Sequence, residues 1–154
     1  MRSWSSGSER ETREVGELLG REAAPDGILL VSGTLGAGKT VLVKGVATAL
    51  GVDPAHVQSP TYTLMQRHHG ALGELLHVDL YRLDPSQLPG IGLEEELAGP
   101  GVKVVEWPER LTAVPGGSIW IHIERGDGDD DRRITQRELP ARPAGLAREG
   151  EQSG

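Results

Sequence analysis

The chain has 154 residues and contains neither cysteine nor phenylalanine. This length is typical of one domain with a buried core, and the absence of cysteine excludes disulfides and thiolate metal sites. Asp and Glu number 23 against 16 Lys and Arg, a formal charge of −7, which argues against DNA binding and extensive RNA contact because clustered cations supply affinity for phosphate backbones. No apolar segment is typical of a membrane span or signal peptide, so we expect a soluble, cytoplasmic protein with no membrane partner.

The N-terminal segment is polar and leads into a helical pattern. Residues 1–7 are rich in serine and are expected to be frayed. Ser8 and Glu11 have the spacing of a capping box, in which side chains satisfy the free backbone N–H groups of the first turn. Apolar residues follow at helical spacing, which predicts a helix over about residues 9–23.

An apolar run at residues 28–31 precedes a glycine-rich segment that matches the P-loop pattern G-x-x-x-x-G-K-[ST]. In a P-loop, backbone N–H groups close around a diphosphate, the lysine reaches the terminal phosphates and the last hydroxyl binds Mg²⁺. Apolar residues at helical spacing up to residue 50 place the motif between a buried strand and a helix N-terminus, whose dipole favours an anion. The predicted nucleotide-binding residues of this segment are Gly33, Thr34, Leu35, Gly36, Ala37, Gly38, Lys39 and Thr40.

The rest of the chain alternates short strands and helices. The predicted elements are a hairpin from residue 64 to Asp79 that turns at 70–73, a short helix opening at Asp84, a solvated helical turn at 93–97, strands at 102–106 and 119–123, and a hairpin partner at 133–139. Pro, Gly, Arg and Glu dominate residues 140–154, which are expected to form a disordered tail. We therefore predict one α/β domain over residues 1–139, a P-loop NTPase-like three-layer α/β/α fold with a mostly parallel sheet and inserted hairpins.

Two acidic residues end apolar segments that are predicted to be buried strands. Asp79 closes the segment 75–78, and Glu106 closes the segment 102–105. The carboxyl ends of parallel strands line the ligand crevice of an open α/β sheet, so both carboxylates are predicted to face the phosphates held by Lys39. There they would hold a Mg²⁺-bound water or orient the attacking water. The alternative is that both acids are ordinary solvent-exposed strand ends.

Three further groups of residues have weaker signals. Residues 59–61 (Ser-Pro-Thr) are a candidate switch loop that senses the γ-phosphate, although the same sequence is typical of a simple turn. His68 and His69 would point to opposite faces of a strand, so together with His77 they are not expected to hold zinc. Trp107 is interpreted as a core residue rather than as a contact surface.

The type of nucleotide is inferred from what the sequence lacks. None of the three lysines lies in the Asn/Thr-Lys-x-Asp loop with which GTPases read guanine, so ATP is favoured. Small-molecule kinases carry an arginine-rich lid over the phosphates, whereas residues 84–100 are acidic. Arg132 and Arg133, beside an Asp-rich loop, are candidates for a phosphate or adenine contact. A small-molecule kinase and a non-hydrolysing, nucleotide-dependent adaptor stay open as alternatives to an ATPase.

Five motifs, taken in order, resemble the TsaE (YjeE) family of bacterial ATPases, which are needed for threonylcarbamoyladenosine modification of tRNA. They are GTLGAGKT at 33–40, SPTYT at 59–63, HVDLYRL at 77–83, GLEEEL at 92–97 and EWPERL at 106–111. Many families share the P-loop, whereas SPTYT, DLYRL and EWPE in this order are specific. The resemblance runs from about Thr12 to Ile134.

The resemblance implies a protein that binds ATP and Mg²⁺ and hydrolyses ATP slowly when alone. It would join the TsaB–TsaD pair, which transfers a threonylcarbamoyl group to adenosine 37 of certain tRNAs. Hydrolysis would reset that assembly between turnovers, so contact with tRNA itself would be indirect or weak.

The family pattern also implies roles for individual residues. Lys39 would hold phosphates, Thr40 would ligate Mg²⁺, and Glu106 would complete the metal site. Asp79 would act near the γ-phosphate, with Trp107 at the same edge.

Two further contacts to the nucleotide are implied by the resemblance. Thr12 matches a family threonine on the first helix that lies near the nucleotide. An arginine of the last hairpin is expected there too, and our candidate is Arg133, with Arg132 as the alternative.

Overall fold

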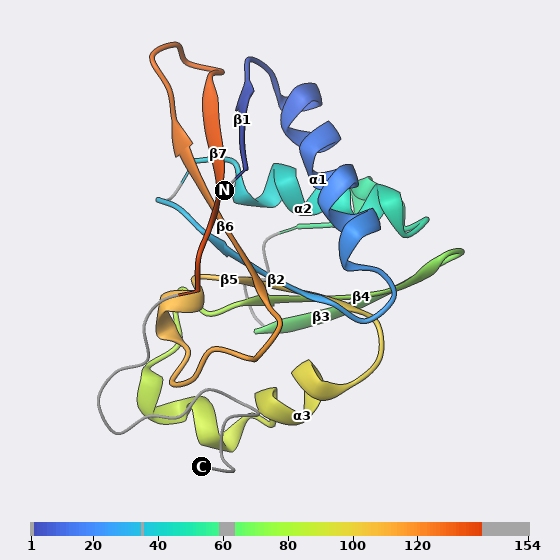
Figure 1. Ribbon diagram of the computed structural model, residues 1–154. Helices are drawn as coiled ribbons and strands as arrows, with labels where there is room; N and C mark the ends of the chain where they lie inside the picture. The colour runs from blue at the N-terminus through green and yellow to red at the C-terminus, as the bar shows by residue number, and fades with distance from the viewer. Residues whose placement is uncertain (1, 35, 59–63, 140–154) are drawn as a thin grey trace.

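The structure is a computed structural model that describes residues 2–34, 36–58 and 64–139 (Figure 1). A seven-stranded sheet in the order β1-β7-β6-β2-β5-β4-β3 forms its centre. The strands are β1 (Ser3–Ser6), β2 (Ile28–Ser32), β3 (Met65–Gly70), β4 (Gly73–Asp79), β5 (Val102–Glu106), β6 (Ile119–Arg125) and β7 (Arg132–Arg137). The helices are α1 (Glu9–Ala23), α2 (Lys39–Ala49) and α3 (Leu93–Ala98), with 3₁₀ turns η1 (Pro54–His56), η2 (Pro85–Gly90) and η3 (Pro108–Arg110).

The four central strands β6, β2, β5 and β4 are parallel, and antiparallel strands flank them on both sides. The central strands β2 and β5 are mostly apolar and buried on both faces, as helix-covered parallel strands require, although β5 also buries Lys103 and Glu106. The register pairs Val31 of β2 with Glu106 of β5, and Glu106 in turn with Asp79 of β4. The carboxyl ends of these three strands therefore meet at one edge of the sheet.

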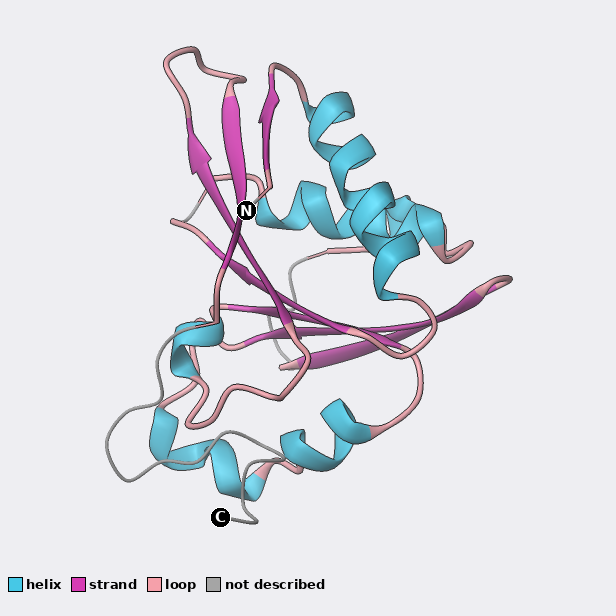
Figure 2. Cartoon of the chain, viewed as in Figure 1, coloured by secondary structure: helices cyan, strands magenta, loops and turns pink. Residues whose placement is uncertain are grey.

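Helices cover the two faces of the sheet, giving the predicted three layers (Figure 2). On one face α1 and α2 pack against β2, β5 and β6, and on the other α3 and η2 cover a second apolar cluster. Gly16 of α1 and Gly45 of α2 let the two helices touch. A Cβ on Gly16 would lie 2.2 Å from the Leu42 carbonyl oxygen, and one on Gly45 would lie 2.1 Å from that of Arg13. This close packing holds the N-terminal part of α1 beside the helix that follows the P-loop.

The predicted helix at residues 9–23 is confirmed, with the same bounds as α1. The Ser8 hydroxyl accepts from the Glu11 N–H at 3.1 Å, and the Glu11 carboxylate accepts from the Gly7 N–H at 2.8 Å. Ser8 thus caps a backbone donor of the first turn as predicted, whereas Glu11 bonds to Gly7, the residue before the cap, and not to Ser8 N–H as a full capping box requires. The short helix at Asp84, the hairpin turn at 70–73 and the strands at 102–106 and 119–123 are also confirmed.

The expectation that residues 1–7 are frayed is wrong for Ser3–Ser6. These residues form β1, which pairs antiparallel with β7 at the edge of the sheet. Only Trp4 packs against the core, so the apolar alternation that reveals a strand in sequence is missing. The Ser6 hydroxyl, 2.7 Å from the Thr12 hydroxyl, and the Arg2–Glu22 ion pair tie the strand to α1.

Two predictions fall on parts of the chain that lie outside the described residues: the switch loop at 59–61 and the tail at 140–154. Within the described part of the chain, no helix is both long enough and apolar enough to cross a membrane.

Candidate functional site

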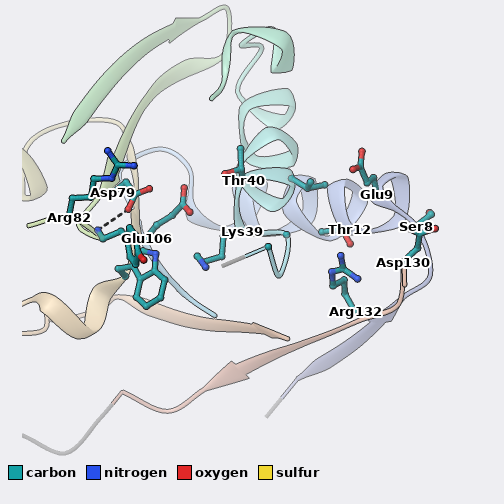
Figure 3. Close-up of a pocket in the computed structure, with 15 residues that line it drawn as sticks. Ser8, Glu9, Thr12, Lys39, Thr40, Asp79, Arg82, Glu106, Asp130 and Arg132 are labelled. Carbon is teal, nitrogen blue, oxygen red and sulfur yellow. Dashed lines mark hydrogen bonds between the residues drawn. The ribbon is translucent and has the colours of Figure 1, made fainter. Parts of the chain in front are cut away.

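A cavity of about 640 Å³ opens at the edge of the sheet where β2, β4 and β5 end (Figure 3). Three walls form it: the P-loop with the start of α2, the ends of β4 and β5, and the start of α1 with the β6–β7 hairpin. Its lining residues are Ser8, Glu9, Thr12, Gly36, Gly38, Lys39, Thr40, Val41, Asp79, Tyr81, Arg82, Glu106, Trp107, Asp130 and Arg132.

The P-loop is built by glycines whose backbone conformations exclude a side chain. Gly33 and Gly38 have φ of 152° and 104°, a region that L residues rarely adopt. A Cβ on Gly33 would lie 2.3 Å from the Ile123 carbonyl oxygen, so the turn packs directly on β6. Gly38 caps α2 in the left-handed conformation and places the N-terminal residues of that helix in the cavity wall. Leu35, also predicted to bind nucleotide, lies outside the described residues.

Lys39 is buried and turned back into its own loop. Its ammonium donates to the carbonyl oxygens of Gly33 at 2.6 Å and Thr34 at 2.7 Å. Burial lowers the pKa of Lys39, and the carboxylates of Glu106 and Asp79 oppose that shift. The amine is thus held by exchangeable hydrogen bonds at the cavity, between the P-loop and the acids across from it.

Asp79 and Glu106 stand side by side at the ends of β4 and β5, as the sequence predicts. The Asp79 carboxylate accepts from the Tyr81 N–H at 2.9 Å, and burial raises its pKa. Glu106 is 2% exposed, and its Oε2 lies 2.5 Å from Nε2 of the fully buried His77. Neither acid is an ordinary solvent-exposed strand end, because both face the cavity opposite Lys39.

Trp107 packs against the second apolar cluster, as its interpretation as a core residue implies, and it is also part of the cavity wall, which that interpretation did not include. It has φ 60°, a strained conformation for a non-glycine residue. Its ring lies 4.7 Å from the Lys39 ammonium and 4.9 Å from the Tyr81 ring. The left-handed turn lets two consecutive residues, Glu106 and Trp107, both reach the cavity, which alternation along a strand would forbid.

The opposite wall combines α1 with the last hairpin. Thr12, which the resemblance implies to lie near the nucleotide, lines the cavity, and its hydroxyl bonds to that of Ser6. Arg132 lies there as well, and its Nε donates to the Ala37 carbonyl oxygen of the P-loop at 2.8 Å. Arg133 is an exposed residue of β7 outside the cavity lining, so of the two candidates Arg132 is the one that the structure brings to the P-loop. Arg125 of β6 also reaches this loop, and its Nη2 donates to the Gly36 carbonyl oxygen at 3.3 Å.

Several lining residues were not predicted from the sequence to belong to the site. Tyr81 and Arg82 belong to the DLYRL motif, which contributes to the family resemblance but did not predict a role for either residue. Ser8, Glu9 and Asp130 reach the cavity only because α1 and the β6–β7 hairpin fold together. His77, considered in the sequence as a zinc candidate, instead bonds to Glu106.

The donor set suits a nucleotide with Mg²⁺. Thr40, Asp79 and Glu106 bring hard oxygen atoms to the same cavity as the P-loop, and hard oxygens are what Mg²⁺ prefers. The ion usually takes one or two protein ligands and fills its remaining positions with water and phosphate oxygens. The residues present fit such an ion bound together with a phosphate chain.

Comparisons with known proteins show the family and the fold. Residues 6–134 match the sequence model of the family described as "Threonylcarbamoyl adenosine biosynthesis protein TsaE". The tRNA threonylcarbamoyladenosine biosynthesis protein TsaE of Bacillus subtilis is 36% identical over 133 residues, covering 86% of this chain and 82% of that protein. The protein of the same name from Treponema pallidum is 38% identical over 132 residues, covering 84% and 96%. The crystal structure of Bacillus subtilis YdiB superposes with a TM-score of 0.69 at 33% identity, covering 88% and 83%.

Proposed function

This chain belongs to the TsaE family of tRNA threonylcarbamoyladenosine biosynthesis, and from that premise we propose that it is a Mg²⁺-dependent ATPase that uses the cavity at the P-loop. The observation that carries the proposal is the convergence of Lys39, Thr40, Asp79 and Glu106 on one cavity. A phosphate-binding lysine, a hydroxyl and a carboxylate that can hold Mg²⁺, and a second carboxylate that can position water are the parts that P-loop NTPases use in phosphoryl transfer.

Each residue then has a distinct task. The backbone N–H groups of the P-loop and the Lys39 ammonium bind the phosphates, and Lys39 exchanges its two carbonyl partners for phosphate oxygens. The Thr40 hydroxyl and the Glu106 carboxylate hold the Mg²⁺ site, and Asp79 orients water near the γ-phosphate. A bound Mg²⁺ would supply neutralisation of the charge that develops on the phosphate oxygens. Thr12 and Arg132 position the nucleotide from the opposite wall.

We further propose that hydrolysis serves partner proteins. The partners expected from the family resemblance are TsaB and TsaD, with ATP turnover resetting their assembly between rounds of tRNA modification. The formal charge of −7 favours an ATPase that acts on proteins over one that binds tRNA by itself.

The experiment that tests the proposal measures ATP hydrolysis by the purified protein, alone and with the TsaB–TsaD pair. We expect slow turnover alone, stimulation by the pair, and loss of both in Lys39→Ala. Lys44→Ala is the matched control, because this second lysine of α2 lies outside the cavity lining. If Lys39→Ala hydrolysed ATP as fast as the unmodified protein, the cavity could not be the site of hydrolysis.

The same assay separates the alternative functions. If the TsaB–TsaD pair does not change the rate of hydrolysis, the assignment as an ATPase would stand and the proposed partners would be rejected. Consumption of ATP that rises with an added metabolite, together with a phosphorylated product, would instead indicate a kinase. ATP that alters binding to the pair but is never cleaved would indicate an adaptor.

A further inference from the structure

The P-loop pattern leaves His77 without a role, although it makes the shortest polar contact to the acid at the end of β5. His77 lies in β4 and is completely buried, and its Nε2 is 2.5 Å from Glu106 Oε2. When Glu106 is ionised, as a metal ligand must be, its carboxylate only accepts hydrogen bonds, so His77 Nε2 is then the N–H that donates to Oε2. This bond uses one carboxylate oxygen, so Oε1 is the oxygen of Glu106 that His77 leaves to the cavity.

A buried histidine that only stabilised the core would be expected to have both ring nitrogens satisfied. His77 does not fit that description, since its Nδ1 has no hydrogen-bond partner among the described residues. Its buried neighbours in β4, Leu76 and Val78, are apolar and face the other side of the sheet. Among the described residues, the imidazole therefore makes one hydrogen bond, the one with Glu106.

The fold explains how His77 can hold the Glu106 carboxylate in one orientation. β4 and β5 are hydrogen-bonded neighbours, and the register places His77 and Asp79 of β4 on the side of the sheet that carries Glu106 of β5. Both partners stand on regular strands, so neither can move without disturbing the sheet. Glu106 is 2% exposed, so a side chain lacking this donor would be a nearly buried charge free to rotate.

We propose that His77 is the positioning residue of Glu106, holding Oε2 so that Oε1 is presented in one orientation to a divalent metal bound with the nucleotide. The proposal rests on the proposed function for the identity of the metal–nucleotide ligand. In many metal sites a carboxylate accepts a hydrogen bond from the histidine that ligates the metal, whereas here the histidine would donate to the ligating carboxylate. Such outer hydrogen bonds orient the ligand, and their loss commonly weakens metal binding or activity.

The test compares two amides of different length at this position. In His77→Gln the side-chain NH₂ can occupy the place of Nε2 and donate to Glu106, whereas in His77→Asn it ends too far away. Both variants remove the imidazole and introduce the same buried amide group, so the difference between them reports on the bond. His68→Asn is the control, because His68 lies on the same face of the neighbouring strand, and its Nε2 is also buried without a partner among the described residues.

The first readout does not depend on turnover. Mn²⁺ is titrated by electron paramagnetic resonance into protein saturated with the non-hydrolysable analogue AMP-PNP. We expect His77→Asn to weaken Mn²⁺ binding roughly ten- to hundredfold, and His77→Gln and His68→Asn to stay within about threefold of the unmodified protein. In a Glu106→Gln background, His77→Asn should change Mn²⁺ binding less than about twofold, because the group that it positions is gone.

The second readout is ATP turnover, where His77→Asn should lower kcat by a similar factor while KM for ATP changes little. Equal Mn²⁺ affinity in His77→Asn and His77→Gln would overturn the proposal, as would an undiminished effect in the Glu106→Gln background. Failure of the unmodified protein to hydrolyse ATP would contradict the proposed function alone, since the Mn²⁺ titration still decides the role of His77. Failure of AMP-PNP and Mn²⁺ to bind the unmodified protein at all would overturn both.

Discussion

Lys39 and Lys103 are two buried lysines near opposite edges of the sheet, Lys39 at the start of α2 beside the carboxyl ends of the central strands and Lys103 near the start of β5. They are 6% and 2% exposed. Their hydrogen bonds are of the same kind. Each ammonium donates to two backbone carbonyl oxygens, Lys39 to Gly33 and Thr34, and Lys103 to Asp26 at 2.9 Å and Gly99 at 2.5 Å. Burial lowers the pKa of both, and nearby carboxylates oppose the shift.

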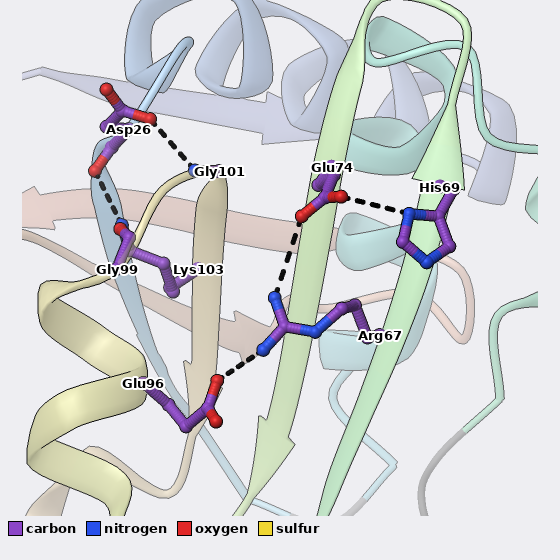
Figure 4. A network of polar contacts seen from close by, with 8 residues as sticks. All are labelled: Asp26, Arg67, His69, Glu74, Glu96, Gly99, Gly101 and Lys103. Carbon is purple, nitrogen blue, oxygen red and sulfur yellow. Dashed lines mark hydrogen bonds and ion pairs between the residues drawn. The ribbon is translucent and has the colours of Figure 1, made fainter.

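What differs is the space around each ammonium. Lys39 faces a cavity that also holds Asp79 and Glu106, and its carbonyl partners belong to a glycine-rich turn. Lys103 instead joins the loop before β2 to the end of α3, where the Asp26 carboxylate accepts from the Gly101 N–H at 2.8 Å (Figure 4). A buried lysine with a lowered pKa is therefore not in itself a functional site. Whether such a lysine belongs to a functional site depends on the edge of the sheet at which it lies and on the groups that its ammonium faces.

Replacing each lysine with methionine should separate these roles, and it gives the largest expected effect. Lys39→Met removes the phosphate contact, so ATP turnover should fall by at least about a hundredfold, while the free energy of unfolding should change by less than about 1 kcal/mol because water in the cavity can solvate the released carbonyls. Lys103→Met leaves two carbonyl oxygens without their donor, which should cost about 1–3 kcal/mol of stability. Turnover per folded molecule should stay the same in Lys103→Met.

Urea unfolding and ATP hydrolysis on the same samples provide the measurements. Methionine keeps the length of the lysine stem, so neither variant opens a large cavity in the core. Two outcomes would contradict this assignment of roles. One is a Lys103→Met variant that is as stable as the unmodified protein but hydrolyses no ATP. The other is a Lys39→Met variant that is largely unfolded but whose folded fraction keeps its full ATP turnover.

The sequence predicted the cavity end of the sheet far better than the opposite end. The P-loop, Asp79 and Glu106 are recognisable because their function fixes residue types at set spacings from apolar strands. Lys103 had no such signal, since its partners are carbonyl oxygens, which every residue possesses. β1 was missed for a related reason: its pairing with β7 is made by backbone groups, and its side chains are mostly serine.

Contacts between segments that are distant in the chain could not be predicted from the sequence either. The placement of Arg132 depends on the course of the β6–β7 hairpin, in which a shift of one residue reverses the face on which a side chain lies. Arg132 and Arg133 are therefore indistinguishable by composition and opposite in position. His77 bonds to a residue 29 positions away through the register of two parallel strands, which no local pattern encodes.

The two adjacent arginines provide the next test at the cavity end, with an intermediate expected effect. Arg132→Ala removes a cation that faces the cavity and a donor to the P-loop carbonyl of Ala37, so it should weaken ATP binding about tenfold. Arg133→Ala makes the same chemical change one residue away and outside the cavity, and should alter ATP affinity less than about twofold. Isothermal titration with AMP-PNP and Mg²⁺ measures both. A larger loss in Arg133→Ala than in Arg132→Ala would reverse the assignment.

The smallest effect is expected at the end of the sheet that carries Lys103. There Arg67 of β3 pairs with Glu96 of α3 and lies 3.7 Å from Glu74 of β4, and His69 Nδ1 bonds to Glu74 at 3.0 Å (Figure 4). The side chains of Arg67, Glu74 and Glu96 are 37%, 40% and 40% exposed. Water and salt screen ion pairs of this exposure, so Arg67→Ala should cost no more than about 1 kcal/mol.

A double-mutant cycle between Arg67→Ala and Glu96→Ala in urea measures that pair. The coupling energy should be about 0.2–1 kcal/mol at low salt and shrink further in 0.5 M NaCl, because added ions screen exposed charges. ATP turnover should be unchanged in all three variants, since this network shares no residue with the cavity lining. A coupling energy that persists in salt, or a change in turnover, would mean that the far end of the sheet holds the strands which position Asp79 and Glu106. Charge at that end would then bear on catalysis and not only on stability.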